Sequence, residues 1–179
     1  MSDLHTIGHS QHPPAAFFAL LARHAIDLLV DVRAAPYSRR HPQFNRETLA
    51  ASLEQHGIRY RWLGRSLGGL REATGPTPHT ALTVPAFQAY AAHLADAACR
   101  DALHELADVA ATRRVVVMCA EADPAHCHRQ FIADALCVDG HAVWHIAANG
   151  EAQAHRLHAA LRVVDGQLVY DRHRQGALF

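Results

Sequence analysis

The chain has 179 residues, of which 50% are hydrophobic and 19% are charged, a composition that excludes a disordered or fibrous protein. Seventeen basic residues balance seventeen acidic ones, so the net charge indicates no particular class of partner. The length is that of one ordinary domain, and we expect residues 1–179 to form a single domain.

Taken in chain order, the sequence of the first half of the chain predicts three strands and two helices. Short apolar runs predict strands over residues 4–7 and 28–32, and an alternating polar and apolar pattern predicts an edge strand over 59–63. Apolar residues at helical spacing predict helices within AAFFALLARHAI (15–26) and ETLAASLEQHGI (47–58).

The second half begins with a stretch rich in Gly, Pro and Thr, residues 64–84, which predicts a long loop. Asp123 and Pro124 carry the signals of a helix start. Helices are expected over 85–98, 101–111, 124–138 and 151–161, and strands over 115–119, 142–146, around 163 and over 168–170. The alternation of strands and helices predicts an α/β, three-layer domain with a mostly parallel sheet of about five strands flanked by helices.

Polar or Gly-rich clusters follow four of the expected strands. They are Gly8-His9-Ser10, residues 33–40, residues 64–69 and residues 119–121. Ligands of parallel sheets gather beyond the carboxyl ends of the strands, so this convergence predicts a site on that edge.

The stretch MCAEADPAHCHR, residues 118–129, carries most of the reactive side chains. The strand period places Cys119 and Glu121 on one face, while the expected helix holds Cys127 in its first turn and directs His128 inward. A helix N-terminus and nearby cations favour a thiolate, so Cys127 is a candidate nucleophile with Cys119 as a second thiol. Glu121 and His128 are candidate acid-base groups. Alternatively, both cysteines are small buried hydrophobes.

A metal is the other interpretation of the same stretch. Zinc or iron accepts the ligand types that Cys119, Glu121, Cys127, His128 and the distant His9 offer. Seven residues separate the two cysteines, which is not a zinc-finger or zinc-ribbon spacing, and no second pair follows. Thiol chemistry therefore ranks above a metal, whose ligands would be Cys119, Cys127 and His128, and the sequence identifies no cofactor.

The other clusters suit an anion. Short Gly loops present backbone N–H groups to phosphates, and arginine guanidinium groups bind them in pairs of hydrogen bonds. The candidate anion- or substrate-binding residues are Gly8, His9, Ser10, Asp31, Arg33, Ser38, Arg39, Gly68, Gly69 and Arg129. The alternative is that these are solvated loops whose arginines pair with nearby carboxylates. Gly68-Gly69 is a flexible flap, a close-approach loop or a turn.

Four motifs occur in order along nearly the whole chain: TIGHS (6–10), LVDVRAAPYSRR (29–40), LGG (67–69) and CAEADPAHCHR (119–129). Together they resemble the bacterial and archaeal domain-of-unknown-function family numbered 488. The resemblance implies a compact α/β domain and supplies no reaction.

Three functions remain open on these residues. The first is an enzyme that acts on a phosphate-bearing substrate, a nucleotide or nucleic acid, through the Cys/Glu/His/Arg cluster. The second is a non-catalytic module that binds nucleic acid or a phosphorylated ligand through the eight arginines of residues 33–71, and the third is a metalloprotein.

Four cysteines are too few and too unevenly spaced for a disulfide scaffold. The start, MSDLHTIGHS, lacks the basic and apolar regions of a secretory signal, and no stretch approaches the roughly 20 apolar residues that cross a bilayer. We expect a cytoplasmic protein without membrane contact, and the sequence leaves its oligomeric state open.

Overall fold

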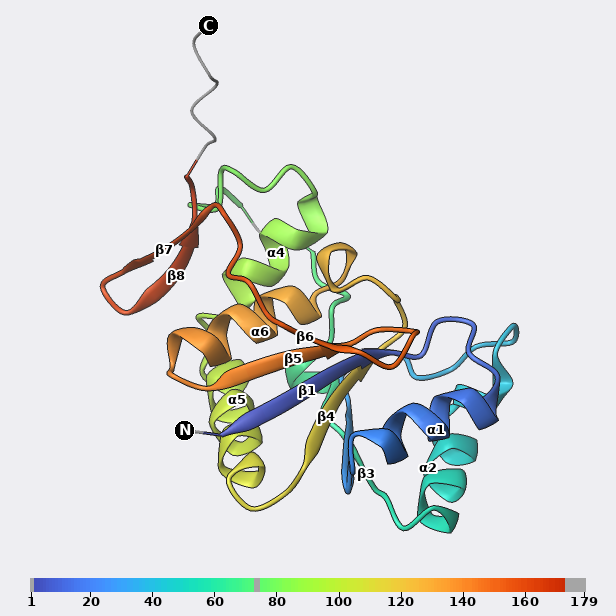
Figure 1. Cartoon of the computed structure of the whole chain (residues 1–179). Helices are drawn as coiled ribbons and strands as arrows, with labels where there is room; N and C mark the ends of the chain where they lie inside the picture. The colour runs from blue at the N-terminus through green and yellow to red at the C-terminus, as the bar shows by residue number, and fades with distance from the viewer. Residues whose placement is uncertain (1, 73–74, 173–179) are drawn as a thin grey trace, which may run out of the picture.

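The computed structural model describes residues 2–72 and 75–172 (Figure 1). Its centre is a six-stranded sheet in the order β3-β2-β4-β1-β5-β6. The strands are β1 (Asp3–Gly8), β2 (Leu28–Asp31), β3 (Arg59–Trp62), β4 (Val115–Cys119), β5 (Ala142–Ile146) and β6 (Ala152–Ala154). All neighbouring pairs are parallel except β5 with β6. The predicted α/β fold with a mostly parallel sheet is confirmed, with one strand more than expected.

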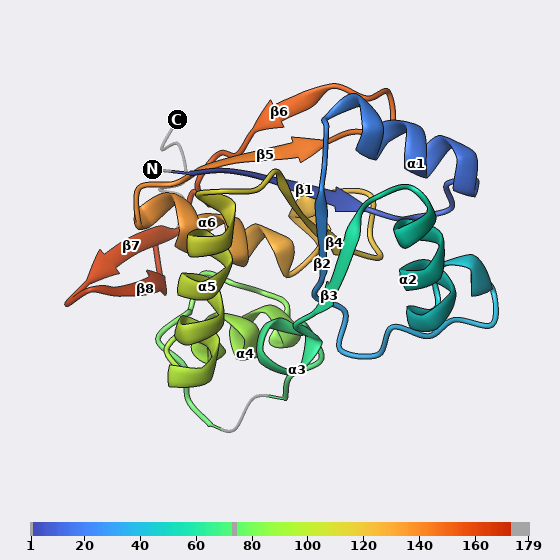
Figure 2. The same ribbon diagram turned by 90° about the horizontal axis from the view of Figure 1, so that it is seen from below.

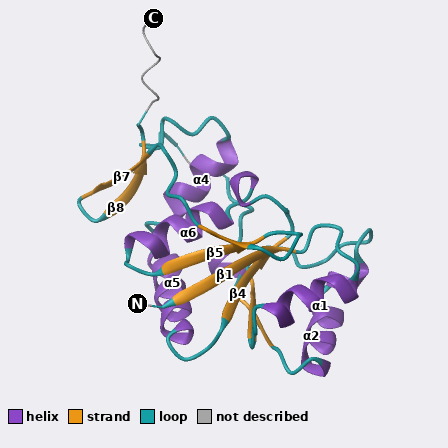
Figure 3. Cartoon of the chain, viewed as in Figure 1, coloured by secondary structure: helices purple, strands orange, loops and turns teal. Residues whose placement is uncertain are grey.

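Helices cover both faces of this sheet (Figures 2 and 3). One face carries α1 (Pro14–Arg23) and α2 (Arg46–Gln55), and the other carries α4 (Pro85–His93), α5 (Ala97–Ala110) and α6 (Arg129–Val138). Alternation along β4 divides the core, since Val116 and Met118 pack with α1 and α2, and Val115 and Val117 pack with α5 and α6.

Short elements complete the chain. They are η1 (Pro42–Phe44), α3 (Gly64–Leu67), η2 (Pro124–His126), β7 (Leu161–Val164) and β8 (Gln167–Tyr170). The last two strands, which the sequence predicted as a pair, form a separate antiparallel hairpin, and β3 lies at an edge of the main sheet, as predicted. The expected loop over residues 64–84 is interrupted at its start by α3.

The helix predicted over residues 151–161 is wrong. Residues 152–154 form β6 instead, antiparallel to β5, and the His155 N–H donates to the carbonyl of Val143 at 2.8 Å. Hydrogen bonds to the open edge of β5 outweigh the helical preference of the alanines, because propensity is weak against tertiary pairing.

The helix predicted over residues 124–138 is broken. The Asp123 carboxylate accepts a hydrogen bond from the Ala125 N–H at 2.8 Å and caps the short η2, as its position predicted. Cys127 then adopts an extended backbone, with φ −138° and ψ 148°, before α6 begins at Arg129. Cys127 therefore lies between two helical segments and not in the first turn of one.

Among the described residues, no helix combines the length and the hydropathy that a membrane-spanning helix needs.

Three histidines are held neutral by the fold. Burial lowers the pKa of His5, His9 and His145 to about 4. An unfolded chain takes up protons at these histidines below about pH 6.5, whereas the folded chain does so only near pH 4. The free energy of unfolding is therefore expected to fall between pH 7 and pH 5, by up to about 2 kcal/mol for each histidine.

Urea unfolding at pH 7, 6 and 5 measures this decline. His9→Gln is expected to reduce the pH dependence, and His104→Gln, at an exposed position on α5, is expected to leave it unchanged. A free energy of unfolding that is constant over this range contradicts the prediction.

Candidate functional site

Cys119, Cys127 and His128 converge at the carboxyl end of β4. Cys119 ends that strand on the face covered by α5 and α6, and His128 immediately precedes α6. The Nδ1 atom of His128 lies 3.7 Å from the Sγ atom of each cysteine. The three side chains are buried, and their Sγ and Nδ1 atoms all lie within 4.8 Å of one another.

The other ring nitrogen of His128 determines which tautomer is present. Nε2 lies 3.2 Å from the carbonyl oxygen of Val32, which only accepts hydrogen bonds, so Nε2 carries the proton. In the neutral ring the lone pair of Nδ1 then faces the two sulfur atoms. Gly69 lies against this atom, and a Cβ at position 69 would be 2.5 Å from Nδ1. Of the alternatives for this loop, a close approach is the one observed.

The surroundings of the two thiols shift their pKa values in opposite directions. The Cys119 thiol lies 3.1 Å from the Glu121 Oε2 atom and beside Cys127, and its single proton can be donated to either. The bond from Cys119, with help from His128 and Arg129, lowers the pKa of Cys127 well below that of a free thiol. The same bond and burial raise the pKa of Cys119. Hydrogen bonds, and not the helix terminus expected from sequence, thus favour one thiolate beside one thiol.

A cavity of about 250 Å³ opens onto these side chains. Glu121 is exposed and contributes to its wall, so a carboxylate, two sulfurs and an imidazole face one space. The remaining lining comes from Arg33, Ala34, Ala35, Gly69, Leu70, Ala86, Phe87, Ala120 and His126.

Arg129 lies elsewhere than expected. Its side chain is only 1% exposed, and its terminal nitrogens donate to Thr6 Oγ1 at 2.9 Å and to the carbonyl oxygens of Glu121 and Ala122 at 2.5 and 3.3 Å. These contacts hold the turn that follows β4, and they occupy the terminal nitrogens that an anion would need.

Arg33, Asp31 and His9 form a second buried cluster on the face of α1 and α2. The Arg33 guanidinium donates to both Asp31 carboxylate oxygens, at 2.9 and 2.6 Å, and to the Phe44 carbonyl at 2.8 Å. Its third nitrogen lies 3.2 Å from His9 Nε2. The strand alternation that directs Cys119 to one face directs Asp31 to the other, so the predicted single cluster is divided and the Arg33 donors are already engaged.

The other predicted anion-binding residues have separate positions. Gly8 packs against the Glu121 backbone, and the Ser10 N–H donates to the Ala120 carbonyl at 2.8 Å. Ser38 Oγ accepts from the His41 N–H at 3.1 Å, and Arg39 is exposed. Gly68 packs closely against Gly64 and Ala34.

Sequence reasoning missed a polar network on the α6 side of the sheet. Thr6, His145, His155 and Asp134 are linked by hydrogen bonds and come from four separate segments. The only local signal is Asp134, a carboxylate inside the otherwise apolar run FIADAL of α6. A buried acid on the packed face of a helix requires partners, which indicates such a network.

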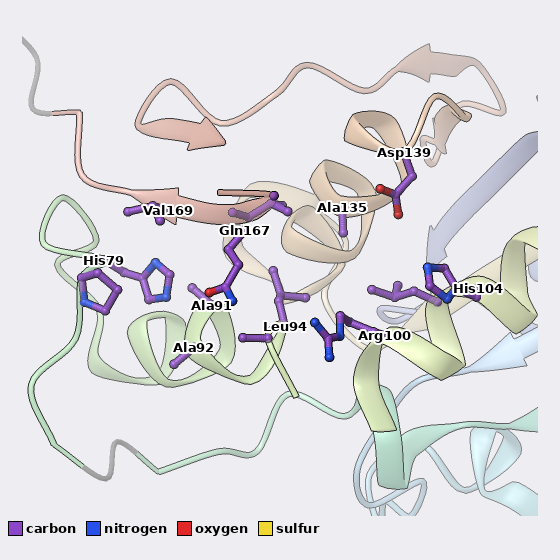
Figure 4. A pocket seen from close by; sticks show the side chains of 15 residues that line it. His79, Ala91, Ala92, Leu94, Arg100, His104, Ala135, Asp139, Gln167 and Val169 are labelled. Atoms are coloured by element: carbon purple, nitrogen blue, oxygen red, sulfur yellow. The ribbon is translucent and has the colours of Figure 1, made fainter. Parts of the chain in front are cut away.

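Three larger spaces lie away from the cysteines. One, of about 390 Å³, is bounded by α4, α5, the end of α6 and β8, with Arg100, His104 and Gln167 at its polar rim (Figure 4). The second is an open groove of about 1250 Å³ along β5 and β6, and the third, of about 450 Å³, lies beside α4. None of the three linings includes a cysteine, so the smaller cavity beside Cys119 and Cys127 is the candidate site.

Comparison with known proteins identifies a family without an assigned activity. The family described as "Domain of unknown function DUF488" matches residues 13–136. No curated protein and no solved structure matches the chain. The matched segment spans more than half of the chain and includes Cys119, Cys127 and His128. The chain therefore belongs to the DUF488 family.

Proposed function

We propose that the protein is a zinc-dependent enzyme whose metal is bound by Cys119, Cys127 and His128. The observation that carries the proposal is the distance of 3.7 Å from His128 Nδ1 to each Sγ atom. Zinc bonds of about 2.3 Å to sulfur and 2.0–2.1 Å to nitrogen, at tetrahedral angles, separate these atoms by about 3.6 Å. The two nitrogen–sulfur distances are already those that a zinc ion requires.

The surroundings of His128 support the same proposal. Histidine ligands commonly donate their other N–H to a backbone carbonyl or a carboxylate, which fixes the tautomer and the ring orientation. The Nε2 atom has such a partner in the Val32 carbonyl. This bond leaves Nδ1 available to the metal.

The number of ligands favours a catalytic site over a structural one. Within residues 2–72 and 75–172, the cluster contains three candidate ligands and no fourth. Catalytic zinc sites have three protein ligands and an open position, and structural sites have four. The cavity of about 250 Å³ adjoins all three ligands and would supply the open position.

Glu121 is the general base in this proposal. Zinc supplies Lewis acidity and lowers the pKa of a bound water to about 7. The Glu121 carboxylate lies at the cavity wall, with Oε2 3.1 Å from Cys119 Sγ. It is therefore placed next to the cluster to accept a proton from a water molecule in the cavity.

A phosphate-bearing substrate, a nucleotide or nucleic acid, completes the proposal. Ala34 and Ala35 line the cavity, and the same loop carries the exposed residues Tyr37, Arg39 and Arg40. Exposed arginines beside an exposed aromatic ring suit an anionic substrate with a base or another flat group. Arg33 and Arg129 contribute less, since their donors are engaged within the protein.

The test combines metal content with hydrolysis. Reduced protein produced with zinc is expected to contain one zinc per chain, and the zinc form is expected to hydrolyse bis(4-nitrophenyl) phosphate. Glu121→Gln is expected to retain the zinc and to lose at least about 100-fold in rate, which is the usual contribution of a general base.

Glu151→Gln provides the matched control, because Glu151 is exposed and lies in the turn between β5 and β6. It is expected to hydrolyse at the unaltered rate. Protein that neither retains zinc nor binds added zinc would overturn the proposal, and equal rates with and without zinc would remove its catalytic part.

A metal-free thiol enzyme is the second candidate, and the lowered pKa of Cys127 favours it. In that case Cys127 is the nucleophile and Cys119 the hydrogen-bond donor that keeps it ionised. Alkylation by iodoacetamide at pH 5 separates the candidates: a metal-free thiolate at Cys127 reacts, whereas zinc protects it.

We also propose that residues 1–179 act as one domain in the cytoplasm. The main sheet takes strands from residues 3–8 and from residues 142–154, so a division of the chain would divide the sheet. All four cysteines are free, as a reducing compartment maintains them.

A further inference from the structure

A chain of hydrogen bonds runs from Arg129, which follows the proposed metal ligands Cys127 and His128, to the buried carboxylate of Asp134. Arg129 donates to Thr6 Oγ1 at 2.9 Å, and Thr6 Oγ1 lies 2.7 Å from His145 Nδ1. His145 Nε2 lies 2.9 Å from His155 Nδ1, and His155 Nε2 lies 2.9 Å from Asp134 Oδ1. Five side chains from β1, β5, α6 and the segment after β6 thus form one continuous array.

The direction of every bond follows from the chemistry of the two ends. Arg129 only donates, so the Thr6 oxygen accepts, and its O–H is left to donate to His145 Nδ1. From the other end, the Asp134 carboxylate only accepts, so His155 Nε2 carries a proton. With neutral rings, both ends require that His145 Nε2 donates to His155 Nδ1. All bonds therefore run from Arg129 toward Asp134 and polarise one another in that direction.

The array connects two buried charges. Asp134 is fully buried and accepts two further hydrogen bonds, from the His158 N–H at 2.9 Å and from the Tyr170 hydroxyl at 3.0 Å. Arg129 forms no ion pair with a carboxylate of the described residues, and its Nε atom has no hydrogen-bond partner there. A buried cation is costly without compensation.

Arg129 is also linked to the proposed metal ligand Cys127, through its backbone amide. The backbone N–H of Arg129 donates to Cys127 Sγ at 3.5 Å, and the guanidinium binds the carbonyl oxygens of Glu121 and Ala122, in the turn that follows Cys119. Arg129 thus contacts the chain segments of both cysteines, and its position depends on Thr6.

We infer that the array of Thr6, His145, His155 and Asp134 positions Arg129, and through it the thiolates of the metal site. This inference rests on the proposed function. None of the four residues touches the metal or the substrate, so they are positioning residues. Partners of this kind change metal affinity by about 10- to 100-fold when they are removed.

Thr6→Val tests the inference, because valine has nearly the shape of threonine and removes both the acceptor and the donor from the middle of the array. Zinc affinity, measured by competition with a chromophoric chelator, is expected to fall about 10- to 100-fold. The thiolate-to-cobalt absorption bands of the cobalt-substituted protein are expected to shift. Thr6→Ser, which retains the hydroxyl, is expected to restore both.

Asp134→Asn tests the other end. Since the array acts as one unit, the losses are not expected to add. The double variant Thr6→Val with Asp134→Asn is expected to bind zinc no more weakly than whichever single variant binds it more weakly. Tyr170→Phe is the matched control, because it removes one hydrogen bond from Asp134 outside the array. It is expected to lower the unfolding temperature and leave zinc affinity and the cobalt bands unchanged.

The outcomes separate the inference from the proposed function. Unchanged zinc affinity and cobalt bands in folded Thr6→Val and Asp134→Asn would overturn the inference while the metal site stands. An equal loss of affinity in Tyr170→Phe would also overturn it, since general destabilisation would then explain the effect. A wild-type protein that binds no zinc would overturn both.

Discussion

Zinc affinity is expected to fall at least about 100-fold when Cys127 is replaced by alanine. A zinc site of four ligands binds with about 10–16 kcal/mol, so one ligand accounts for about 3 kcal/mol, or about two orders of magnitude in affinity. Cys119→Ala and His128→Ala are expected to show losses of the same order, because each removes one of three ligands from one buried cluster. Competition with a chromophoric chelator measures all three.

Cys137→Ala is the control for these variants. Cys137 is half-buried on α6 and lies outside the cluster, so its loss is expected to leave zinc affinity unchanged. Wild-type affinity in Cys127→Ala would place any metal elsewhere and would refute the proposed site. Cobalt substitution adds a direct reading, since each lost thiolate reduces the intensity of the sulfur-to-cobalt bands.

Gly8→Ala is expected to destabilise the protein by about 3 kcal/mol or more. A Cβ at position 8 would lie 1.8 Å from the carbonyl oxygen of Glu121 and 2.9 Å from the Cα of Ala122. Both atoms belong to the backbone, which has to move by more than an ångström, whereas a flexible side chain could rotate away. Overpacking of this kind costs about 1–3 kcal/mol and occasionally more.

Gly57→Ala separates this clash from ordinary glycine strain. Gly57 has a φ of +71° and nothing within 4 Å of the position that its Cβ would take, so only the left-handed backbone costs energy, about 1 kcal/mol. Urea unfolding compares the two variants. If Gly8→Ala is no less stable than Gly57→Ala, the backbone of residues 121–122 moves away at little cost and the prediction is wrong. Because Arg129 binds that turn, Gly8→Ala is also expected to weaken zinc binding.

Local pattern predicted most of the fold. Strand alternation and helical spacing placed β1, β2, β4 and β5 and the main helices within a few residues of their observed bounds, because burial on one or both faces leaves a periodic record in the sequence. Two predictions were wrong, at η2, where the helix is broken locally at Cys127, and at β6, where the backbone pairs with the neighbouring strand β5.

The ranking of thiol above metal chemistry depended on the spacing between Cys119 and Cys127, and the structure gives a reason to reverse it. Spacing rules describe ligands that meet within one local motif. Here the extended residue Cys127 and His128 return to the end of β4 after a turn, and the approach of Val32 and Gly69 fixes the ring. None of these approaches is visible in the spacing.

The sequence by itself determined the order of the strands and long helices as far as β5, the two apolar faces of the sheet and the stretch that holds Cys119, Glu121, Cys127 and His128. Only the tertiary structure decided that the guanidinium groups of Arg33 and Arg129 donate their hydrogen bonds within the protein. It also decided that Thr6 lies between Arg129 and the network that ends at Asp134. The physical reason is that periodicity is a property of each segment alone. The hydrogen bonds of a buried charge, in contrast, depend on which distant segments pack around it.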